Sequence, residues 1–297
     1  MTEERLHFTQ RDQCSASQRM LAAFLPPMKL PAFLALLSIT LSTATAAEPT
    51  KPQAQPKKEK PLTPGGIYRQ GDMQRPRPTV ITPPTASTPE KPGAAPSDAT
   101  VLFDGSDFSH WEREPRKDDP TPDDKAPKWI IKDGYMECTP KSGVIRCKDR
   151  FGSTQLHIEW ATPSEVKGNS QGRGNSGVLL SGWGEVQVLD SFENDTYPDG
   201  QAAALYSQYP PLVNASRKPG EWQTYDIILQ CAVMKDGKVE TPAMITVLHN
   251  GVVVHHAVKQ DHQHQEWGFA LQDHGNPVRY RNLWARPLHR YDENAAN

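Results

Sequence analysis

Between residues 129 and 272 the chain alternates apolar and polar positions over short runs. Apolar side chains recur at every second position, which is the period of a strand with one buried face. Gly, Pro, Asn and Asp separate the runs and mark turns, and Asn250-Gly251 is typical of a β-hairpin. The pattern shows no long amphipathic helix and no internal repeat, so it predicts an all-β sandwich. The predicted strands are 129–131, 134–138, 143–146, 155–160, 176–180, 185–189, 224–229, 243–248, 252–256 and 267–272.

Two longer polar segments interrupt this pattern. Residues 112–128 are rich in Asp and Pro, and residues 192–221 contain several Pro, Asn and Asp residues. Long loops on a compact β scaffold often carry binding residues. We therefore expect these two segments to frame a cleft.

The N-terminal part of the chain has the layout of a secretory signal peptide. Met28 opens a short basic head, residues 32–43 are apolar, and residues 44–47 are small. The apolar run is shorter than the roughly 20 residues that a membrane span needs. Residues 1–27 carry polar and charged groups that do not belong ahead of such a signal, so we expect translation to start at Met28. The sequence predicts cleavage after Ala47 and an exported protein, periplasmic or extracellular, without a membrane span.

Residues 48–98 have the composition of a linker. They hold twelve of the 28 prolines and one aromatic residue. Such a segment buries too little apolar surface to offset its ordering entropy, so we predict a disordered tether. The aromatic residues gather after it, and residues 99–291 are long enough for one domain with a substantial core, followed by a tail at 292–297.

Net charge and cysteine content indicate which partners, disulfides and zinc sites to expect. The formal net charge of −2 does not favour nucleic acid as a partner. Three cysteines follow the predicted signal peptide, Cys138, Cys147 and Cys231, and an odd number leaves at least one thiol unpaired. Cys138 and Cys147 flank a turn and could pair, or both could be buried thiols. No zinc-binding spacing of Cys and His is present.

The strand around residue 187 carries the strongest candidate chemistry. Glu185 and Gln187 share one face of the predicted strand, and a bulge after Gln187 would bring Asp190 to the same face. Two carboxyl groups and an amide on one face can supply acid and base catalysis or oxygen ligands for a cation. A strand with a solvated polar face shows the same alternation, and the pattern alone does not separate the two.

Other candidate residues each have a structural alternative. Asn175 could contact substrate or form a turn. Gln272 and His274 could face a groove as a pair, whereas a histidine bonded to a loop carbonyl is the alternative. Arg281 could bind a sugar oxygen or pair with a carboxylate, and Tyr206 could stack on a sugar or belong to the core.

Ordered motifs along the predicted domain resemble one family. Residues 101–111 read VLFDGSDFSHW, similar to the opening pattern L-F-(N/D)-G-x-(D/N)-(L/F)-x-x-W of the 3-keto-glycoside lyases and hydratases, also called 3-keto-disaccharide hydrolases. Further matches follow in order at 129–134, 175–178, 185–190, 204–206, 218–222, 250–251 and 271–282. Together they extend over nearly the whole predicted domain.

The resemblance implies a concanavalin A-like jelly roll, with two curved antiparallel sheets and a carbohydrate-binding groove. Glycosidases of the same architecture carry the strand motif E-x-D-x-x-E, where this chain has Glu185, Gln187 and Asp190. A central amide and a shorter final acid would not preserve the carboxyl separation of about 5 to 5.5 Å that retaining hydrolysis requires. The motif therefore favours different sugar chemistry.

The resemblance also implies a 3-keto sugar as substrate. Its ketone acidifies the C2 proton, so the C1 substituent can leave by elimination, followed by hydration or net hydrolysis. On this interpretation Glu185 and His274 serve as base or as ligands of a divalent cation, and Asp190 takes the remaining acid/base role. The expected substrate contacts are Asn175, Gln187, Tyr206, Gln272 and Arg281. No organic cofactor is expected, and a non-catalytic carbohydrate-binding module is the alternative function.

Overall fold

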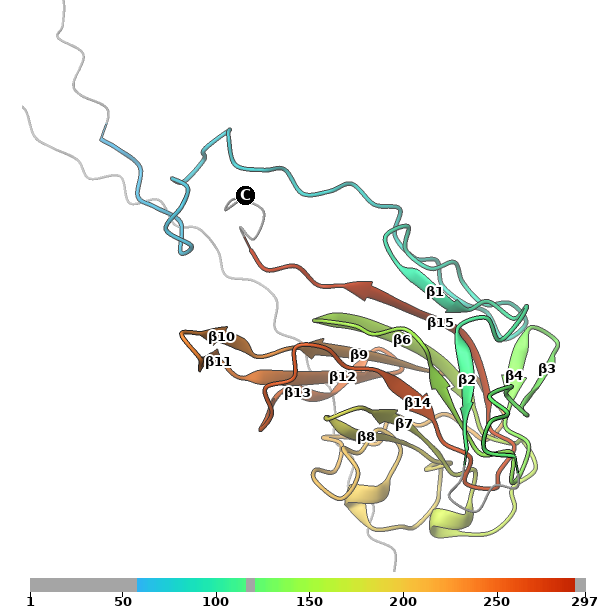
Figure 1. Ribbon diagram of the computed structural model, residues 1–297. Coiled ribbons are helices and arrows are strands. Elements are labelled where there is room, and N and C mark those ends of the chain that lie inside the picture. Colours follow the sequence, from blue (N-terminus) through green and yellow to red (C-terminus); the bar gives the residue numbers. More distant parts are fainter. Residues whose placement is uncertain (1–57, 116–120, 292–297) are drawn as a thin grey trace, which may run out of the picture. The chain divides into compact units, whose positions relative to one another are not determined.

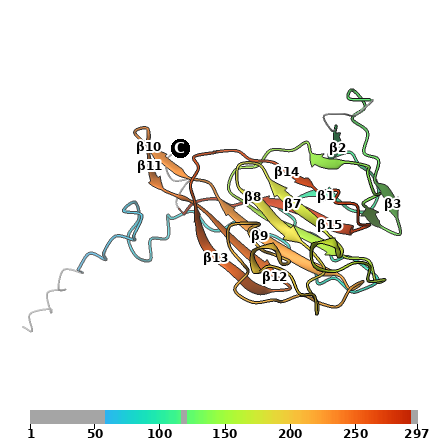
Figure 2. The ribbon, with the colours of Figure 1, turned by 90° about the horizontal axis from the view of Figure 1, so that it is seen from below.

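The computed structural model describes residues 58–115 and 121–291. The predicted signal peptide, the linker before residue 58 and the C-terminal tail lie outside these residues. From Glu59 onward the described residues form one compact unit of two antiparallel sheets packed face to face (Figures 1 and 2). This confirms the predicted all-β jelly-roll sandwich. No helix in the described part of the chain is long and apolar enough to cross a membrane.

The larger sheet has eight strands in the order β13-β12-β9-β6-β15-β4-β3, with β1 also paired to β15. Its strands are β1 (Thr100–Phe103), β3 (Ile130–Lys132), β4 (Tyr135–Glu137), β6 (Thr154–Ala161), β9 (Gln223–Gln230), β12 (Ala243–His249), β13 (Val252–Gln260) and β15 (Arg279–Pro287).

The smaller sheet has five strands in the order β2-β5-β14-β7-β8. Its strands are β2 (Trp111–Glu114), β5 (Val144–Cys147), β7 (Ser176–Leu180), β8 (Gly184–Val188) and β14 (Phe269–Leu271). The remaining elements are a two-stranded ribbon of β10 (Val233–Lys235) and β11 (Lys238–Thr241), and two 3-10 turns, η1 (Ser170–Gly172) and η2 (Pro198–Gly200).

The core lies between the two sheets and follows the period of two. Tyr225, Ile227 and Leu229 of β9 are buried, and the residues between them are partly exposed. Two buried tyrosines join the sheets by hydrogen bonds. The Tyr225 hydroxyl donates to the backbone oxygen of Gln187 over 2.6 Å, and the Tyr280 hydroxyl donates to Ser176 Oγ over 2.6 Å. The packing thus fixes β8, which carries the candidate site, against the eight-stranded sheet.

The predicted hairpin at Asn250-Gly251 joins β12 to β13. Both residues have positive φ angles, 51° and 77°, as a two-residue turn of this type requires. Strand β15 was not predicted, because a bulge between Arg281 and Trp284 interrupts its alternation. The segment 112–128, predicted as a loop, contributes its first residues to β2.

The three cysteines beyond the predicted signal peptide are free thiols. Cys138, Cys147 and Cys231 are all buried and none forms a disulfide. Burial raises the pKa of the Cys147 thiol to about 12. Cys138 and Cys147 are therefore two buried thiols and not a disulfide pair.

Residues 82–97 form an irregular hairpin, which we call the strap hairpin. Backbone hydrogen bonds join Thr85 N to Ala94 O over 3.1 Å and Thr88 N to Lys91 O over 2.8 Å. The hairpin lies against the outer face of the eight-stranded sheet, and next to it Asp98 forms an ion pair with Arg286 at 2.6 Å. Residues 82–98 of the predicted linker are thus hydrogen-bonded in the structure, and these bonds compensate for the lack of apolar burial.

Candidate active site

Strand β8 presents Glu185 and Gln187 on the outer face of the five-stranded sheet, as the alternation predicted. Leu179 of β7 pairs with Glu185, and Gly177 pairs with Gln187. On its other side β8 is joined to a returning loop, since Tyr206 N donates to the backbone oxygen of Glu185 over 3.0 Å. Both edges of β8 are thus hydrogen-bonded, which holds the strand rigidly.

The carboxylate of Glu185 lies over Gly177. A Cβ atom on Gly177 would come within 1.9 Å of Glu185 Oε1, so a residue with a side chain there would displace the carboxylate. Gly177 therefore leaves the space that Glu185 occupies.

Burial raises the pKa of Glu185 to about 7. No hydrogen bond or ion pair from another described residue reaches its carboxylate, so nothing in that part of the chain offsets the loss of solvent. At neutral pH the group is therefore divided between its protonated and ionised forms. A carboxyl group in this state can both accept and return a proton.

Gln187 and Asn175 belong to a buried amide network on the same face. Gln187 Nε2 donates to Gln171 Oε1 over 3.0 Å, and Asn175 Nδ2 donates to the backbone oxygen of Gln171 over 2.6 Å. Gln171 in turn donates to Thr196 Oγ1 and to the backbone oxygen of Gly200, each over 2.9 Å. The network ties η1 and the loop before η2 to β8, so these amides position the surroundings of Glu185.

Tyr206 lies directly across from Glu185 on the returning loop. Val186 and Leu205 form an antiparallel bridge, so their neighbours Glu185 and Tyr206 face the same side. The hydroxyls of Tyr206 and Tyr197 are 2.6 Å apart. Loss of solvent, the hydrogen bond to Tyr206 and nearby negative charge raise the pKa of Tyr197 to about 12. Tyr197 is therefore a protonated phenol at neutral pH.

Gln272 also joins this face. It directly follows β14, and its backbone N–H donates to the Gly177 oxygen over 3.0 Å. Gln272 therefore continues the strand, and its side chain points to the face opposite that of buried Leu271. Its side chain is partly exposed. The structure thus gathers Asn175, Glu185, Gln187, Tyr206 and Gln272 of the predicted residues on one sheet face.

Asp190 does not join Glu185 and Gln187. Strands β7 and β8 pair in continuous register, so the expected bulge after Gln187 does not form. Asp190 lies beyond the end of β8, is 2% exposed, and forms an ion pair with Arg173 at 2.7 Å. Arg173 also donates to the backbone oxygen of Phe192, so this pair holds the start of the loop.

His274 lies in the loop between β14 and β15 and is exposed. Within residues 58–115 and 121–291, no three His, Cys, Asp or Glu side chains come close enough together to hold a metal ion. The side chains around Glu185 therefore do not form a fitting cation site, and metal binding by Glu185 and His274 stays a prediction from the sequence.

Arg281 lies on the opposite side of the sandwich, on the outer face of the eight-stranded sheet. Its Nε atom is 2.7 Å from Glu159 Oε2. Arg281 is 4% exposed and Glu159 is 1% exposed. Of the two roles considered for Arg281, the structure shows pairing with a carboxylate. It cannot reach a sugar bound over Glu185, because the core separates the two faces.

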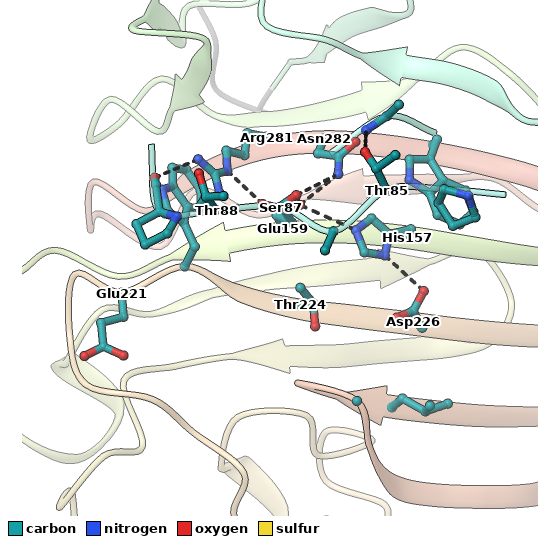
Figure 3. Close-up of a pocket in the computed structure, with 18 of the residues that line it drawn as sticks. Thr85, Ser87, Thr88, His157, Glu159, Glu221, Thr224, Asp226, Arg281 and Asn282 are labelled. Carbon is teal, nitrogen blue, oxygen red and sulfur yellow. Dashed lines mark hydrogen bonds and ion pairs between the residues drawn. The ribbon is translucent and has the colours of Figure 1, made fainter. Parts of the chain in front are cut away.

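Arg281 and Glu159 line a cavity of about 1010 Å³, which we call the strap groove (Figure 3). Its two buried charges, Glu159 and Arg281, are already paired with each other. Desolvation would raise the pKa of Glu159, yet hydrogen bonds from His157, Asn282, Ser87 and Arg281 lower it to about 2.

The pKa of His157 is raised, whereas that of Glu159 is lowered. Burial would lower its pKa, but Asp226 and Glu159 together raise it to about 9. Its ring stacks on Trp284 with centroids 4.8 Å apart, and its Nδ1 is 3.0 Å from Asp226 Oδ1. Both His157 and Glu159 stay charged at neutral pH, so neither is poised for proton transfer. Glu185 is the better candidate for catalysis.

Residues 98–286 match the sequence profile of the family described as 3-keto-alpha-glucoside-1,2-lyase-like domain. This chain belongs to that family. Both Glu185 and Gln272 fall inside the matched region.

One solved structure supports the same assignment of the 3-keto-alpha-glucoside-1,2-lyase-like domain. A Parabacteroides distasonis protein whose structure carries the name "putative glycosyl hydrolase" is 39% identical, with a TM-score of 0.64, and the match covers 77% of this chain and 100% of that one. A second protein of that bacterium, named in the same way, is 18% identical with a TM-score of 0.48 over 65% and 94% of the two chains. No curated protein matches the sequence. The chain is accordingly a carbohydrate-active protein similar to glycosyl hydrolases.

Proposed function

We propose that this protein cleaves 3-keto-glucosides by elimination, with Glu185 as the base that removes the C2 proton. The observation that carries the proposal is the unpaired carboxyl of Glu185, whose pKa burial raises to about 7. A base with a pKa near the working pH gives the best compromise between being ionised and being able to bind a proton. The family to which the chain belongs, named after 3-keto-glucoside lyases, supports the choice of substrate.

The proposed reaction starts with transfer of the C2 proton of the sugar to a Glu185 oxygen. The C–H electron pair forms a double bond between C2 and C3, and negative charge moves to the oxygen on C3. When this charge returns to form the ketone, the C1–O bond breaks and a double bond forms between C1 and C2. The leaving oxygen takes up one proton. Addition of water across C1 and C2 then gives net hydrolysis.

Tyr206 is the proposed donor of the proton to the leaving oxygen. It lies across from Glu185 on the same face, at the roughly 5 Å Cβ separation of a cross-strand pair. Its hydroxyl contacts that of Tyr197, so a second phenol can replace the proton. Gln272, partly exposed on the same face, is the proposed hydrogen-bond partner of a sugar hydroxyl.

The test uses a chemically prepared nitrophenyl 3-keto-glucoside, with release of the nitrophenol followed by absorbance. Glu185→Gln should lower kcat by about 10²- to 10⁴-fold, as expected for loss of a general base. Glu165→Gln is the matched control, because Glu165 is an exposed carboxylate paired with exposed Lys167. Tyr206→Phe should also lower kcat, but less for nitrophenol than for a glucosyl leaving group, which needs protonation more.

Release of nitrophenol at the wild-type rate by Glu185→Gln would exclude Glu185 as the base. No turnover by the wild-type protein, with or without added Mg²⁺, Ca²⁺, Mn²⁺ or Zn²⁺, would favour a non-catalytic carbohydrate-binding module. We also propose that the protein is exported and acts in the periplasm or outside the cell, on the strength of the signal-like layout at 28–47.

A further inference from the structure

The tip of the strap hairpin forms one wall of the strap groove and contacts the Glu159–Arg281 pair through three oxygen atoms (Figure 3). The Ser87 hydroxyl donates to Glu159 Oε1. The backbone oxygens of Thr88 and Pro89 accept hydrogen bonds from Arg281 Nη2 and Nη1 over 2.6 and 3.0 Å. The tip therefore offers one hydroxyl donor and two oxygen acceptors to a buried ion pair.

The groove keeps its own organisation beneath the hairpin. Glu159 and Arg281 bond to each other, and Asn282 Nδ2 donates to Glu159 Oε1 over 2.8 Å. The ring of Trp222, which is partly exposed, lies 4.2 Å from the guanidinium carbon of Arg281. Strands β6 and β15 supply the paired charges, and these remain paired when the tip is removed.

The hairpin itself is weakly held. Most of its side chains are exposed, and Pro96 is the buried one among residues 82–97. Its three hydrogen bonds to Glu159 and Arg281 contribute about 1.5 to 3 kcal/mol each, and with little apolar burial beside them the segment can open locally. The strap hairpin therefore resembles a bound ligand more than a part of the core.

We propose that the strap groove is a second carbohydrate-binding site, and that the strap hairpin covers its Glu159–Arg281 pair by imitating a saccharide. A sugar ring offers hydroxyl donors to Glu159 and oxygen acceptors to Arg281, which reproduces the contacts of the tip, and its apolar face can lie against Trp222, which also lines the groove. The ligand is a neutral oligosaccharide, because Glu159 is paired with Arg281 and His157 with Asp226, and the other charged residues that line the groove, Arg217, Glu221 and Arg279, are of mixed sign.

Closure lowers the apparent affinity in a calculable way. A ligand that binds only the open form has its dissociation constant multiplied by the reciprocal of the open fraction. A hairpin that is open about 1% of the time therefore weakens binding about 100-fold. The site would bind its ligand weakly in the intact protein and more tightly when the hairpin is released.

The test opens the hairpin without altering the residues of β6, β9 and β15 beneath it. In Gly93→Ala the new Cβ would lie 1.9 Å from the Thr85 oxygen, so the hairpin cannot close as before. Ser87→Asp is a second opening variant, because it sets a carboxylate against Glu159. Glu90→Gln, at an exposed position of the turn, is the matched control. Hydrogen exchange of residues 82–97 reports the opening.

Calorimetry with cellohexaose and maltohexaose, together with tryptophan fluorescence, measures binding on the full-length proteins. At least one of the two sugars should bind both opening variants at least tenfold more tightly than wild type and Glu90→Gln. Adding Trp222→Ala to an opening variant should abolish the gain, whereas adding Glu185→Gln should leave it, which separates this site from the catalytic one.

Equal affinity in opened and closed proteins overturns the proposal. So does the absence of measurable binding in both opening variants when hydrogen exchange confirms that the hairpin is released. Binding of a synthetic 82–97 peptide to the opened protein without binding of either sugar would overturn it as well, because the groove would then be specific for the peptide.

Discussion

Glu185→Gln should make the protein less active and, at alkaline pH, more stable. The folded protein raises the Glu185 pKa from 4.5 to about 7 because the carboxylate is desolvated without a partner. Each pKa unit corresponds to about 1.4 kcal/mol, so the ionised group would cost the folded state about 3 kcal/mol. Because Glu185 is partly exposed, solvent screening reduces this to about 1 to 2 kcal/mol.

The sign follows from proton linkage. Between pH 4.5 and about 7 the folded protein binds more protons at Glu185 than the unfolded chain does, so the free energy of unfolding falls as the pH rises through this window. Above about pH 7 the full cost is present. Gln has the same shape without the charge, so the variant lacks this loss.

Thermal unfolding of wild type and Glu185→Gln at pH 5 and pH 8 measures the effect. For a domain of this size 1 kcal/mol corresponds to about 2 to 4 °C, so the variant should melt about 2 to 8 °C higher at pH 8 and nearly equal to wild type at pH 5. Glu165→Gln should change neither value by more than about 1 °C. A lower melting temperature for Glu185→Gln at pH 8 would refute the reasoning, since it would mean that the carboxylate has a stabilising partner.

Three further predictions concern other parts of the molecule. Gly177→Ala should lower kcat at least tenfold with the fold kept by circular dichroism, because the new Cβ displaces Glu185; wild-type kcat would show that the carboxylate has room elsewhere. Glu159→Gln should lower the free energy of unfolding by about 3 to 5 kcal/mol by leaving Arg281 charged and buried, and adding Arg281→Met should restore most of it; equal stability of wild type and single variant in denaturant titration would contradict this. Mass spectrometry of the mature protein should find an N-terminus near residue 48, and one that retains residue 1 would exclude the predicted processing.

The sequence was a good guide wherever the period of two was unbroken. Glu185 and Gln187 lie on one face of β8 as predicted, because pairing with β7 on one side and the returning loop on the other keeps the strand regular. The alternation of apolar and polar positions also predicted the orientation of Gln272, which lies on the same face as Glu185 and Gln187. The fold class followed from many such runs, so an error in one run had little effect.

Three features depend on contacts that no local pattern contains. Asp190 is turned away by Arg173, which is 17 residues earlier in the chain. The bulge in β15 hides a central strand in a polar stretch around Arg281. The strap hairpin has the composition of a linker, and its order comes from Glu159 and Arg281, 72 and 192 residues away from their partners. A clue was present at Thr88-Pro89-Glu90-Lys91, since proline at the second position is typical of a β-turn.

The two sheets differ in how much they depend on the segment that precedes β1. Residues 82–97 contact Glu159 and Arg281 on the eight-stranded sheet. Glu185 lies on the other sheet, beyond the core. A truncation that removed residues 82–97 would therefore uncover Glu159 and Arg281 and leave the contacts around Glu185 unchanged.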